Sequence, residues 1–197
     1  MNNTNDLPNP IVLASASPRR LELLSQAGVQ FTVLVPGVDE TPHVAETPQA
    51  MVERLALLKA STIARAQPGS YVIGADTTVF IDGQSLGKPT SEREAYEMLM
   101  SIQGRTHQVW GGIAIVHERL GISRVWSHMT EVTMRSMNSQ QVHAYVATKE
   151  PLDKAGSYAI QGIGLQFVDT ISGSYSNVVG LNIASLLSEL RGLACKA

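Results

Sequence analysis

Two adjacent arginines stand at the start of an expected helix in the stretch LASASPRR, residues 13–20. Ser17 is a typical N-cap residue and Pro18 a typical first helical residue, so Arg19 and Arg20 fall in the first turn. An anion gains roughly 0.3–1 kcal/mol from the helix dipole there, and a cation loses a comparable amount. A helix amino end binds phosphate readily, and arginine offers forked donors to phosphate oxygens. The pair therefore predicts a phosphate site, with side chains that simply extend into solvent as the alternative.

A second candidate is the aspartate that interrupts the apolar stretch VIGADTTVF, Asp76. Burying an unpaired carboxylate is costly, and open α/β sheets collect their ligands at strand ends. Asp76 is therefore a candidate metal ligand or general base, or else an aspartate that caps a turn. Asp39 and Glu40, in the loop GVDETPH, could supply a second carboxylate to the same cation. Magnesium is typically held by a few carboxylates together with substrate phosphates.

Two lysines and a glutamine complete the set of candidates. Lys88 precedes Pro89, which restricts its backbone to extended geometry. Lys59 lies close to the apolar stripe of its expected helix, where a lysine most often extends its ammonium group to water. Gln161, followed by Gly162, is suited to recognising the edge of a base, although an ordinary turn is equally allowed. Together these residues predict a metal-dependent site for a phosphorylated small molecule, without selecting a reaction.

Alternating strands and helices predict an α/β protein that positions these residues. The patterns favour strands over residues 11–15, 31–35, 71–86 (with a hairpin turn at Asp82-Gly83), 107–118, 123–136 and 165–168. Helices are expected to begin after Ser17, Thr47, Ser91, Asn138 or Ser139, and Asn182, with Ser91 and Glu94 forming a capping box. No repeat or linker divides the chain, so we expect a flexible lead-in over residues 1–10 and a single domain over residues 11–197.

Composition excludes several classes of protein. With 44% hydrophobic residues in a chain of 197, the sequence is typical of a folded globular protein. A formal net charge of -2 gives no basic field for nucleic acid, and no apolar run is long enough to cross a membrane. The polar first ten residues do not form a signal peptide, and the lone Cys195 fits a reducing compartment, so a cytoplasmic protein is expected.

Several common catalytic motifs are absent from the sequence. It contains no Gly-x-x-x-x-Gly-Lys-Ser/Thr phosphate loop, no Gly-x-Ser-x-Gly elbow and no complete dinucleotide fingerprint. Its five histidines are scattered without zinc-ligand spacing, which favours surface or strand-face positions for them.

The candidate residues fall within segments that resemble the Maf family of nucleoside triphosphate pyrophosphatases. The similar segments are LASASPRRLELL, the VDE loop, the lysine of LLKAS, IGADTTV, LGKP, SIQGRTHQV, KEPLDKAGSYAIQG and GSYSNVVGL. They extend in order over nearly the whole chain, from Ile11 to Leu190. The resemblance implies a Maf/ITPase-like elongated α/β fold, with a bent mixed sheet flanked by helices and a central cleft between two lobes. It also implies a homodimer.

The resemblance also implies roles for individual residues. Asp76 matches the family's proton acceptor, and Glu40, Lys59 and Lys88 match charged residues that line its cleft, the two lysines being catalytic. Arg20 matches a phosphate-binding arginine. The implied reaction is hydrolysis of a nucleoside triphosphate to the monophosphate and pyrophosphate with a divalent metal.

Three positions separate the branches of the family. The branch that resembles dTTP/UTP pyrophosphatases has arginine, threonine and glutamine there, as in Arg19, Thr77 and Gln161 of this chain. The branch that acts on 7-methyl-GTP tends to have an aromatic residue, glutamine and glutamate. The three residues therefore predict substrate binding and a preference for pyrimidine nucleotides, with Ser17 as a further substrate contact. Asn182 replaces a proline that is frequent in relatives, and no effect on the chemistry is expected.

The expected mechanism combines these assignments. Magnesium or manganese, held by Asp76 and Glu40, bridges the triphosphate, while four cationic residues neutralise the phosphates: Arg19, Arg20, Lys59 and Lys88. Asp76 positions and deprotonates a water that attacks the α-phosphorus. Two alternatives are a pyrophosphatase with another nucleotide preference, such as 7-methyl-GTP, and a nucleotide-binding regulator of cell division and septum formation. Nucleic acid and membranes are not expected as partners.

Overall fold

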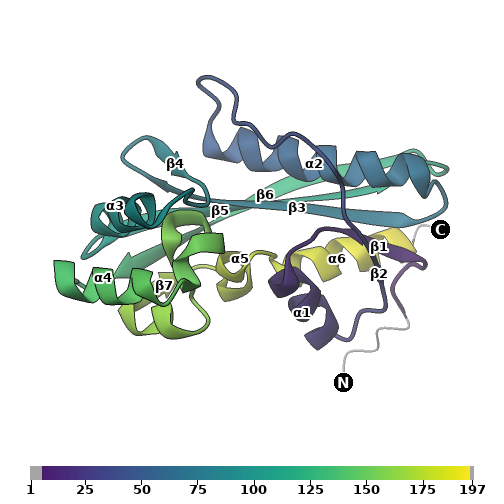
Figure 1. Ribbon diagram of the computed structural model, residues 1–197. Helices are drawn as coiled ribbons and strands as arrows, with labels where there is room; N and C mark the ends of the chain where they lie inside the picture. The colour runs from purple at the N-terminus through teal and green to yellow at the C-terminus, as the bar shows by residue number, and fades with distance from the viewer. Residues whose placement is uncertain (1–5, 196–197) are drawn as a thin grey trace. The chain divides into compact units, whose positions relative to one another are not determined.

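The structure is a computed structural model that describes residues 6–195 (Figure 1). The described chain divides into two compact units. The first contains everything up to Asp76, then Gly111–His128 and everything from Gly180, and the second contains Thr77–Trp110 and Met129–Val179. No helix in residues 6–195 has the length and apolar character needed to cross a membrane. The predicted lead-in over residues 1–10 lies partly outside the described residues, and the single domain over residues 11–197 stays a prediction.

One seven-stranded sheet supplies the framework, with six of its strands in the order β2-β1-β3-β5-β6-β7 and β4 paired to β3. Its strands are β1 (Ile11–Ala14), β2 (Thr32–Leu34), β3 (Tyr71–Ile81), β4 (Gln84–Leu86), β5 (Thr106–His117), β6 (Ile122–Met134) and β7 (Val168–Ser172). β1 pairs in parallel with both β2 and β3, whereas the β3–β4 and β6–β7 pairs are antiparallel. The expected α/β class with a mixed sheet flanked by helices is therefore confirmed.

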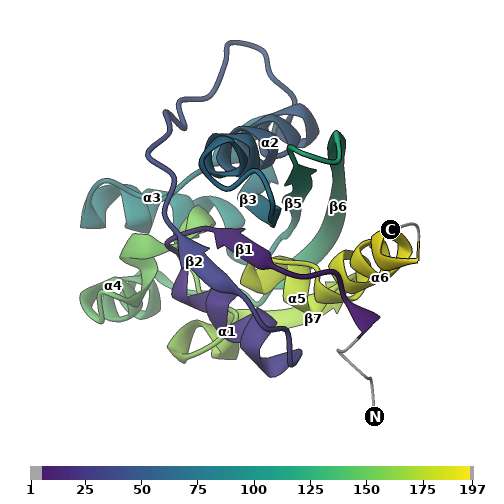
Figure 2. The same ribbon diagram turned by 90° about the vertical axis from the view of Figure 1, so that its right-hand side faces the viewer.

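The first unit carries three helices, α1 (Pro18–Gln26), α2 (Pro48–Ala66) and α6 (Ile183–Ala194). Figures 1 and 2 both show α2 lying lengthwise along the strands. Alanines make this approach close, because Ala56, Ala60 and Ala64 are fully buried against valines and alanines of β1, β3 and β5. Glycines bring the backbones closer still. A Cβ added at Gly74 would lie 2.1 Å from the Ala56 carbonyl oxygen, and one at Gly112 would lie 2.2 Å from the Val52 carbonyl oxygen.

The second unit carries α3 (Glu92–Ile102), α4 (Ser139–Ala147) and the short α5 (Tyr175–Val179). It also has three 3-10 turns, η2 (Glu150–Asp153), η3 (Ala155–Ser157) and η4 (Ile163–Phe167). α3 and α4 lie side by side in Figure 1, and Tyr96 of α3 stacks on His143 of α4 with ring centroids 4.4 Å apart. The unit is therefore richer in short turns than in long helices.

Most sequence-predicted boundaries are confirmed. Thr47 and Asn138 accept hydrogen bonds from the expected backbone N–H groups, and Asn138 forms a full capping box with Gln141. Asp82 and Gly83 both have positive φ, as a tight hairpin turn requires.

Ser17 occupies the N-cap position as predicted, although its side chain makes no capping hydrogen bond. Two predictions need correction. Ser91 caps α3, but the Glu94 carboxylate accepts from Thr90 instead of completing the predicted capping box. The strand predicted over residues 165–168 is a 3-10 turn, and the strand begins at Val168.

Candidate active site

Asp76 is the centre of the charged cluster in the first unit. It lies in the middle of β3, where neighbouring backbone groups pair with the sheet, and it is 7% exposed. The turn-capping alternative is therefore wrong. Lys59, projecting from α2, is 6% exposed and places its Nζ 2.7 Å from Asp76 Oδ1. Lys59 does not extend to water as the sequence suggested, because the sheet beneath α2 offers it a buried carboxylate.

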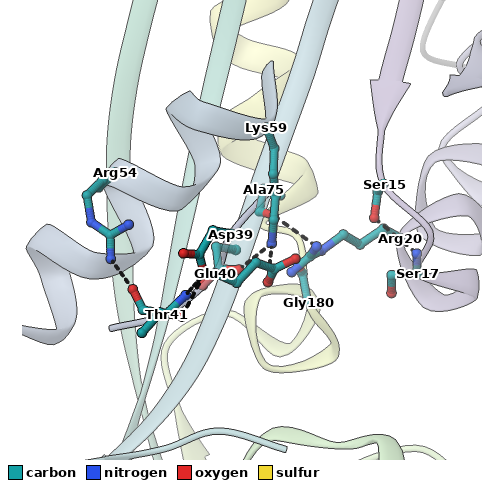
Figure 3. Close-up of polar contacts among 11 residues, drawn as sticks. Ser15, Ser17, Arg20, Asp39, Glu40, Thr41, Arg54, Lys59, Ala75 and Gly180 are labelled. Carbon is teal, nitrogen blue, oxygen red and sulfur yellow. Dashed lines mark hydrogen bonds and ion pairs between the residues drawn. The ribbon is translucent and has the colours of Figure 1, made fainter. Parts of the chain in front are cut away.

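Glu40 provides the second carboxylate of the cluster. Lys59 Nζ donates to Glu40 Oε2 at 2.8 Å, so one ammonium group joins two carboxylates from different segments (Figure 3). Asp76 is buried, whereas the Glu40 side chain is 55% exposed. The cluster therefore has one enclosed acid and one acid that faces solvent.

The loop that carries Glu40 is fixed to α2 by an arginine. Arg54 donates from Nε to Glu46 Oε1 at 2.6 Å and from Nη2 to Glu46 Oε2 at 2.7 Å, and it also reaches the Thr41 carbonyl oxygen. The hydrogen bonds from Arg54 lower the pKa of Glu46 to about 2. Asp39 does not join the cluster, because it accepts from the backbone and hydroxyl of Thr41. The second carboxylate is thus Glu40 rather than Asp39.

Arg20 fixes the backbone around Asp76. Its Nη1 donates to the Ala75 carbonyl oxygen and its Nε to the Gly180 carbonyl oxygen, both at 2.9 Å (Figure 3). It therefore ties the first turn of α1 to the strand residue before Asp76 and to the segment before α6. Ser17 lies beside this turn, where its backbone N–H donates to Ser15 Oγ.

Burial and charge act in opposite directions on this cluster. Burial raises the pKa of Asp76, and the positive charges of Lys59 and Arg20 partly offset that rise. Burial likewise lowers the pKa of Arg20, and the carboxylates of Asp76 and Glu40 oppose that change. A carboxylate whose proton affinity is increased by burial, and whose ionised form is stabilised by a neighbouring lysine, is suited to accept a proton from water.

The remaining predicted residues are distributed over both units. Arg19 is half-buried on α1 in the first unit. Thr77 directly follows Asp76 on β3 and is half-buried, Lys88 is exposed, and Gln161 is half-buried between Ile160 and η4, all three in the second unit. Lys88 makes no hydrogen bond or ion pair with any other residue in 6–195. The structure therefore brings together Arg20, Glu40, Lys59 and Asp76 within one unit.

Sequence reasoning missed Arg54 and Glu46, which position the Glu40 loop. The eight-residue separation between them crosses the start of α2, so helix spacing gave no signal for the pair. Glu150 was also missed, because the backbone N–H groups that it accepts from, those of Ile163 and Gly164, are at least 13 residues away in the sequence.

The carboxylates available to a metal are few. Residues 6–195 contain no group of three or more His, Cys, Asp or Glu side chains arranged to hold an ion. Asp76 and Glu40 already converge on one cation, the Lys59 ammonium group. Two carboxylates are a sufficient protein contribution for magnesium in nucleotide enzymes, where phosphates and water complete the coordination. The donor set therefore fits a divalent metal that binds together with a phosphorylated substrate.

Comparison with known proteins gives a consistent picture. Residues 10–193 match the family model described as Maf-like protein. A protein of Desulfotalea psychrophila named dTTP/UTP pyrophosphatase is 48% identical over 92% of this chain and 93% of its own length. A protein of Shewanella denitrificans with the same name is 51% identical over 92% of this chain and 95% of its own length. The structure of the Staphylococcus aureus Ham1 protein matches 93% of this chain and 98% of its own, with a TM-score of 0.54 at 18% identity, which shows a shared fold.

Proposed function

Because the chain belongs to the Maf-like protein family, we propose that it is a nucleoside triphosphate pyrophosphatase that converts dTTP and UTP to their monophosphates and pyrophosphate. Membership confirms the resemblance found in the sequence. The substrate assignment is supported by relatives of that name at about half identity over most of the chain, and by Arg19, Thr77 and Gln161 at the branch-determining positions. The observation that carries the catalytic assignment is the buried contact between Lys59 and Asp76.

Asp76 is proposed to accept the proton of the attacking water. Lys59 holds Oδ1 of Asp76 in a fixed direction, and its positive charge opposes the rise in the Asp76 pKa that burial causes. Arg20 holds the neighbouring Ala75 carbonyl, so the backbone around Asp76 does not need to rearrange during the reaction. A base fixed in this way avoids the reorganisation that the same carboxylate would undergo in water.

The cationic residues are proposed to neutralise the triphosphate. Arg20 contributes positive charge beside Asp76, and its two carbonyl contacts keep the guanidinium group in place. Arg19, Lys59 and Lys88 are proposed to contribute the remaining protein charge, Ser17 a further contact, and Thr77 and Gln161 the selection of the base. Stabilisation of a developing phosphate charge by preorganised cations is the main requirement of phosphoryl transfer.

A divalent cation, magnesium or manganese, is proposed as cofactor. Asp76 and Glu40 would hold it, because they are the two carboxylates that converge in the site. When bound, such an ion neutralises phosphate oxygens and makes water more acidic. We further propose that the protein acts in the cytoplasm as a homodimer, without nucleic acid or a membrane as partner. The small net charge of -2 supports the absence of a nucleic-acid partner.

The test is release of pyrophosphate from dTTP, UTP, CTP, GTP and 7-methyl-GTP, with magnesium, with manganese and with a chelator. We expect the highest kcat/KM for dTTP and UTP and loss of turnover with the chelator. A best rate with a purine nucleotide would overturn the substrate assignment. Saturable binding without metal-dependent pyrophosphate release would favour the regulator of cell division instead.

Asp76→Asn tests the base directly. Removal of a general base costs about 10²–10⁴-fold in rate, so kcat should fall by at least about a hundredfold while the fold is retained. Asp82→Asn is the matched control, because Asp82 is exposed and has positive φ, which asparagine also tolerates. Near-normal pyrophosphate release by Asp76→Asn would rule out Asp76 as the proton acceptor.

A further inference from the structure

The Glu150 carboxylate is a fixed point for the segment that carries Gln161. Its Oε2 accepts the backbone N–H of Ile163 at 2.9 Å, and its Oε1 accepts the backbone N–H of Gly164 at 2.8 Å. Both bonds lie within the second unit, between η2 and the start of η4. One carboxylate therefore holds the chain immediately after Gln161.

Tyr145 holds the chain on the other side of Gln161. Its hydroxyl donates to Glu150 Oε1 at 2.8 Å and accepts the backbone N–H of Ala159 at 3.0 Å. Tyr145 is 2% exposed on α4, so its ring is held firmly by packing. Gln161 thus lies between two anchored residues, Ala159 and Ile163, each two positions away and each tied to the same Tyr145–Glu150 pair.

Two glycines bring the backbone of the segment close to Tyr145 and Glu150. Gly162 has φ +96, and a Cβ there would lie 2.5 Å from Glu150 Oε2. A Cβ at Gly164 would lie 2.4 Å from the Tyr145 hydroxyl oxygen. The segment therefore closes directly onto the Tyr145–Glu150 pair, with no side chain between them.

The charge of Glu150 is essential to these contacts. Burial raises its pKa, but the hydrogen bonds from Ile163, Gly164 and Tyr145 outweigh burial and lower the pKa overall. An ionised carboxylate accepts from all three donors, whereas a glutamine amide must present its NH₂ group to at least one of them. Replacement of Glu150 by glutamine therefore preserves the size of the side chain but removes at least one of the three hydrogen bonds.

We propose that Glu150 is a positioning residue that sets nucleotide selectivity by fixing the backbone on both sides of Gln161, with Tyr145 as its partner. Glu150 does not touch the substrate in this scheme and acts only through the segment 159–164. The inference rests on the proposed function, in which Gln161 selects the base. It predicts that discrimination among bases depends on a carboxylate that belongs to another turn of the chain.

The experiment compares kcat/KM for UTP with kcat/KM for CTP, two nucleotides that differ only in the base, in the unmodified protein and in the variants Glu150→Gln, Tyr145→Phe and Gln161→Ala. The ratio is the readout, because a loss of correctly folded enzyme lowers both values equally and leaves the ratio unchanged. We expect Glu150→Gln and Tyr145→Phe to lower the UTP/CTP ratio about fivefold, in the same direction as Gln161→Ala, as expected for about 1 kcal/mol of lost discrimination. Glu97→Gln is the control, because Glu97 is 59% exposed on α3 and, within residues 6–195, forms its ion pair with Arg93 alone.

The outcomes separate the inference from the proposed function. If Gln161→Ala lowers the ratio and neither Glu150→Gln nor Tyr145→Phe does, the positioning role is wrong and the function stands. If Gln161→Ala leaves the ratio unchanged, or if the unmodified protein does not discriminate between the bases, the assignment of base selection to Gln161 is wrong. The positioning role of Glu150, which rests on that assignment, is then wrong as well. If Glu150→Gln does not fold, Tyr145→Phe decides, because it retains the ring and removes only the hydroxyl that joins Glu150 to Ala159.

Discussion

Gly74 gives the sharpest test of how packing positions the active site. It lies two residues before Asp76 on β3, directly beneath α2, which carries Lys59. In the variant Gly74→Ala, the new Cβ would lie 2.1 Å from the Ala56 carbonyl oxygen and 2.7 Å from the Ala60 backbone nitrogen. These neighbours are backbone atoms of a helix, so no side-chain rotation relieves the contact.

The size of the effect follows from these distances. An ordinary contact begins near 3.4 Å, so the backbone of α2 must move away from β3 by about 1 Å. Gly112 holds the same helix at the Val52 carbonyl, which prevents a simple tilt. Overpacking of this kind costs typically 1–3 kcal/mol, and we expect about 3 kcal/mol here. For a domain of this size that is a fall in Tm of roughly 6–12 °C.

The same shift disturbs the chemistry, because Lys59 moves with α2. A displacement of about 1 Å lengthens the 2.7 Å contact between Lys59 Nζ and Asp76 Oδ1 beyond hydrogen-bonding distance. Since misplacement by about 1 Å can cost up to 10²-fold in rate, we expect kcat/KM for dTTP to fall by about 10- to 100-fold.

Thermal unfolding measures the loss of stability. Pyrophosphate release, assayed at a temperature well below the Tm of both the variant and the unmodified protein, measures the loss of activity. Gly192→Ala is the matched control, because Gly192 lies in α6 and, among residues 6–195, nothing beyond its chain neighbours and the nearby backbone of the helix lies within 4 Å of the new Cβ. It should leave activity unchanged and raise stability by up to about 1 kcal/mol through helix propensity. A Gly74→Ala protein with unchanged Tm would refute the packing argument. One that loses stability but keeps full kcat/KM would refute the link between α2 and the site.

Two further predictions concern the second unit. Burial lowers the pKa of His107 from its ordinary 6.5 to about 4, so the unfolded chain binds this proton more readily. The contribution of His107 to the free energy of unfolding is therefore fully present above pH 6.5, and about 3 kcal/mol of it is lost as the pH falls from 6.5 to 4. Urea unfolding of His107→Gln, which cannot titrate, should show a smaller loss over that range, and equal losses would contradict the assignment. Gly162→Ala should be less stable than Gly121→Ala by about 2 kcal/mol. The Cβ added at Gly162 would lie 2.5 Å from Glu150 Oε2, and the backbone there (φ 96, ψ -149) is one that glycine alone adopts readily, whereas Gly121 has φ 62 and nothing within 4 Å of its Cβ. Equal Tm values for these two variants would show that the contact with Glu150 is relieved without cost.

The elements that the sequence predicted correctly are those with local causes. Thr47 and Asn138 accept hydrogen bonds from N–H groups three residues away, and the Asp82-Gly83 turn depends only on its own backbone angles. The start of the strand at Val168 was misplaced because its cause is not local. The apolar residues Leu165 and Phe167 resemble a strand, but the Tyr145–Glu150 pair, distant in sequence, anchors the preceding residues in a 3-10 turn.

The sequence was sufficient to identify most residues of the candidate site, but not to predict which of them contact one another. Asp76 was recognisable as a charge in an apolar stretch, but nothing local shows that Lys59 reaches it, since that depends on α2 packing closely over Gly74. The choice of Glu40 over Asp39 was equally hidden. It depends on Thr41 occupying the Asp39 carboxylate and on Lys59 facing the loop.

The first-turn arginines can now be interpreted through the charge of the whole cluster. The guanidinium group of Arg20 is stabilised by two carbonyl oxygens and by the nearby carboxylates of Asp76 and Glu40, so its position in the helix is compensated within the protein. Arg20 and Lys59 together balance Asp76 and Glu40, which makes this cluster neutral as a set. A triphosphate bound there would bring several negative charges to the cluster, so tight binding would require additional cations. Arg19 is the protein cation adjacent in sequence, and a divalent metal that entered with the substrate would supply positive charge that the four side chains do not. The charge balance therefore supports metal-dependent binding independently of which nucleotide is preferred.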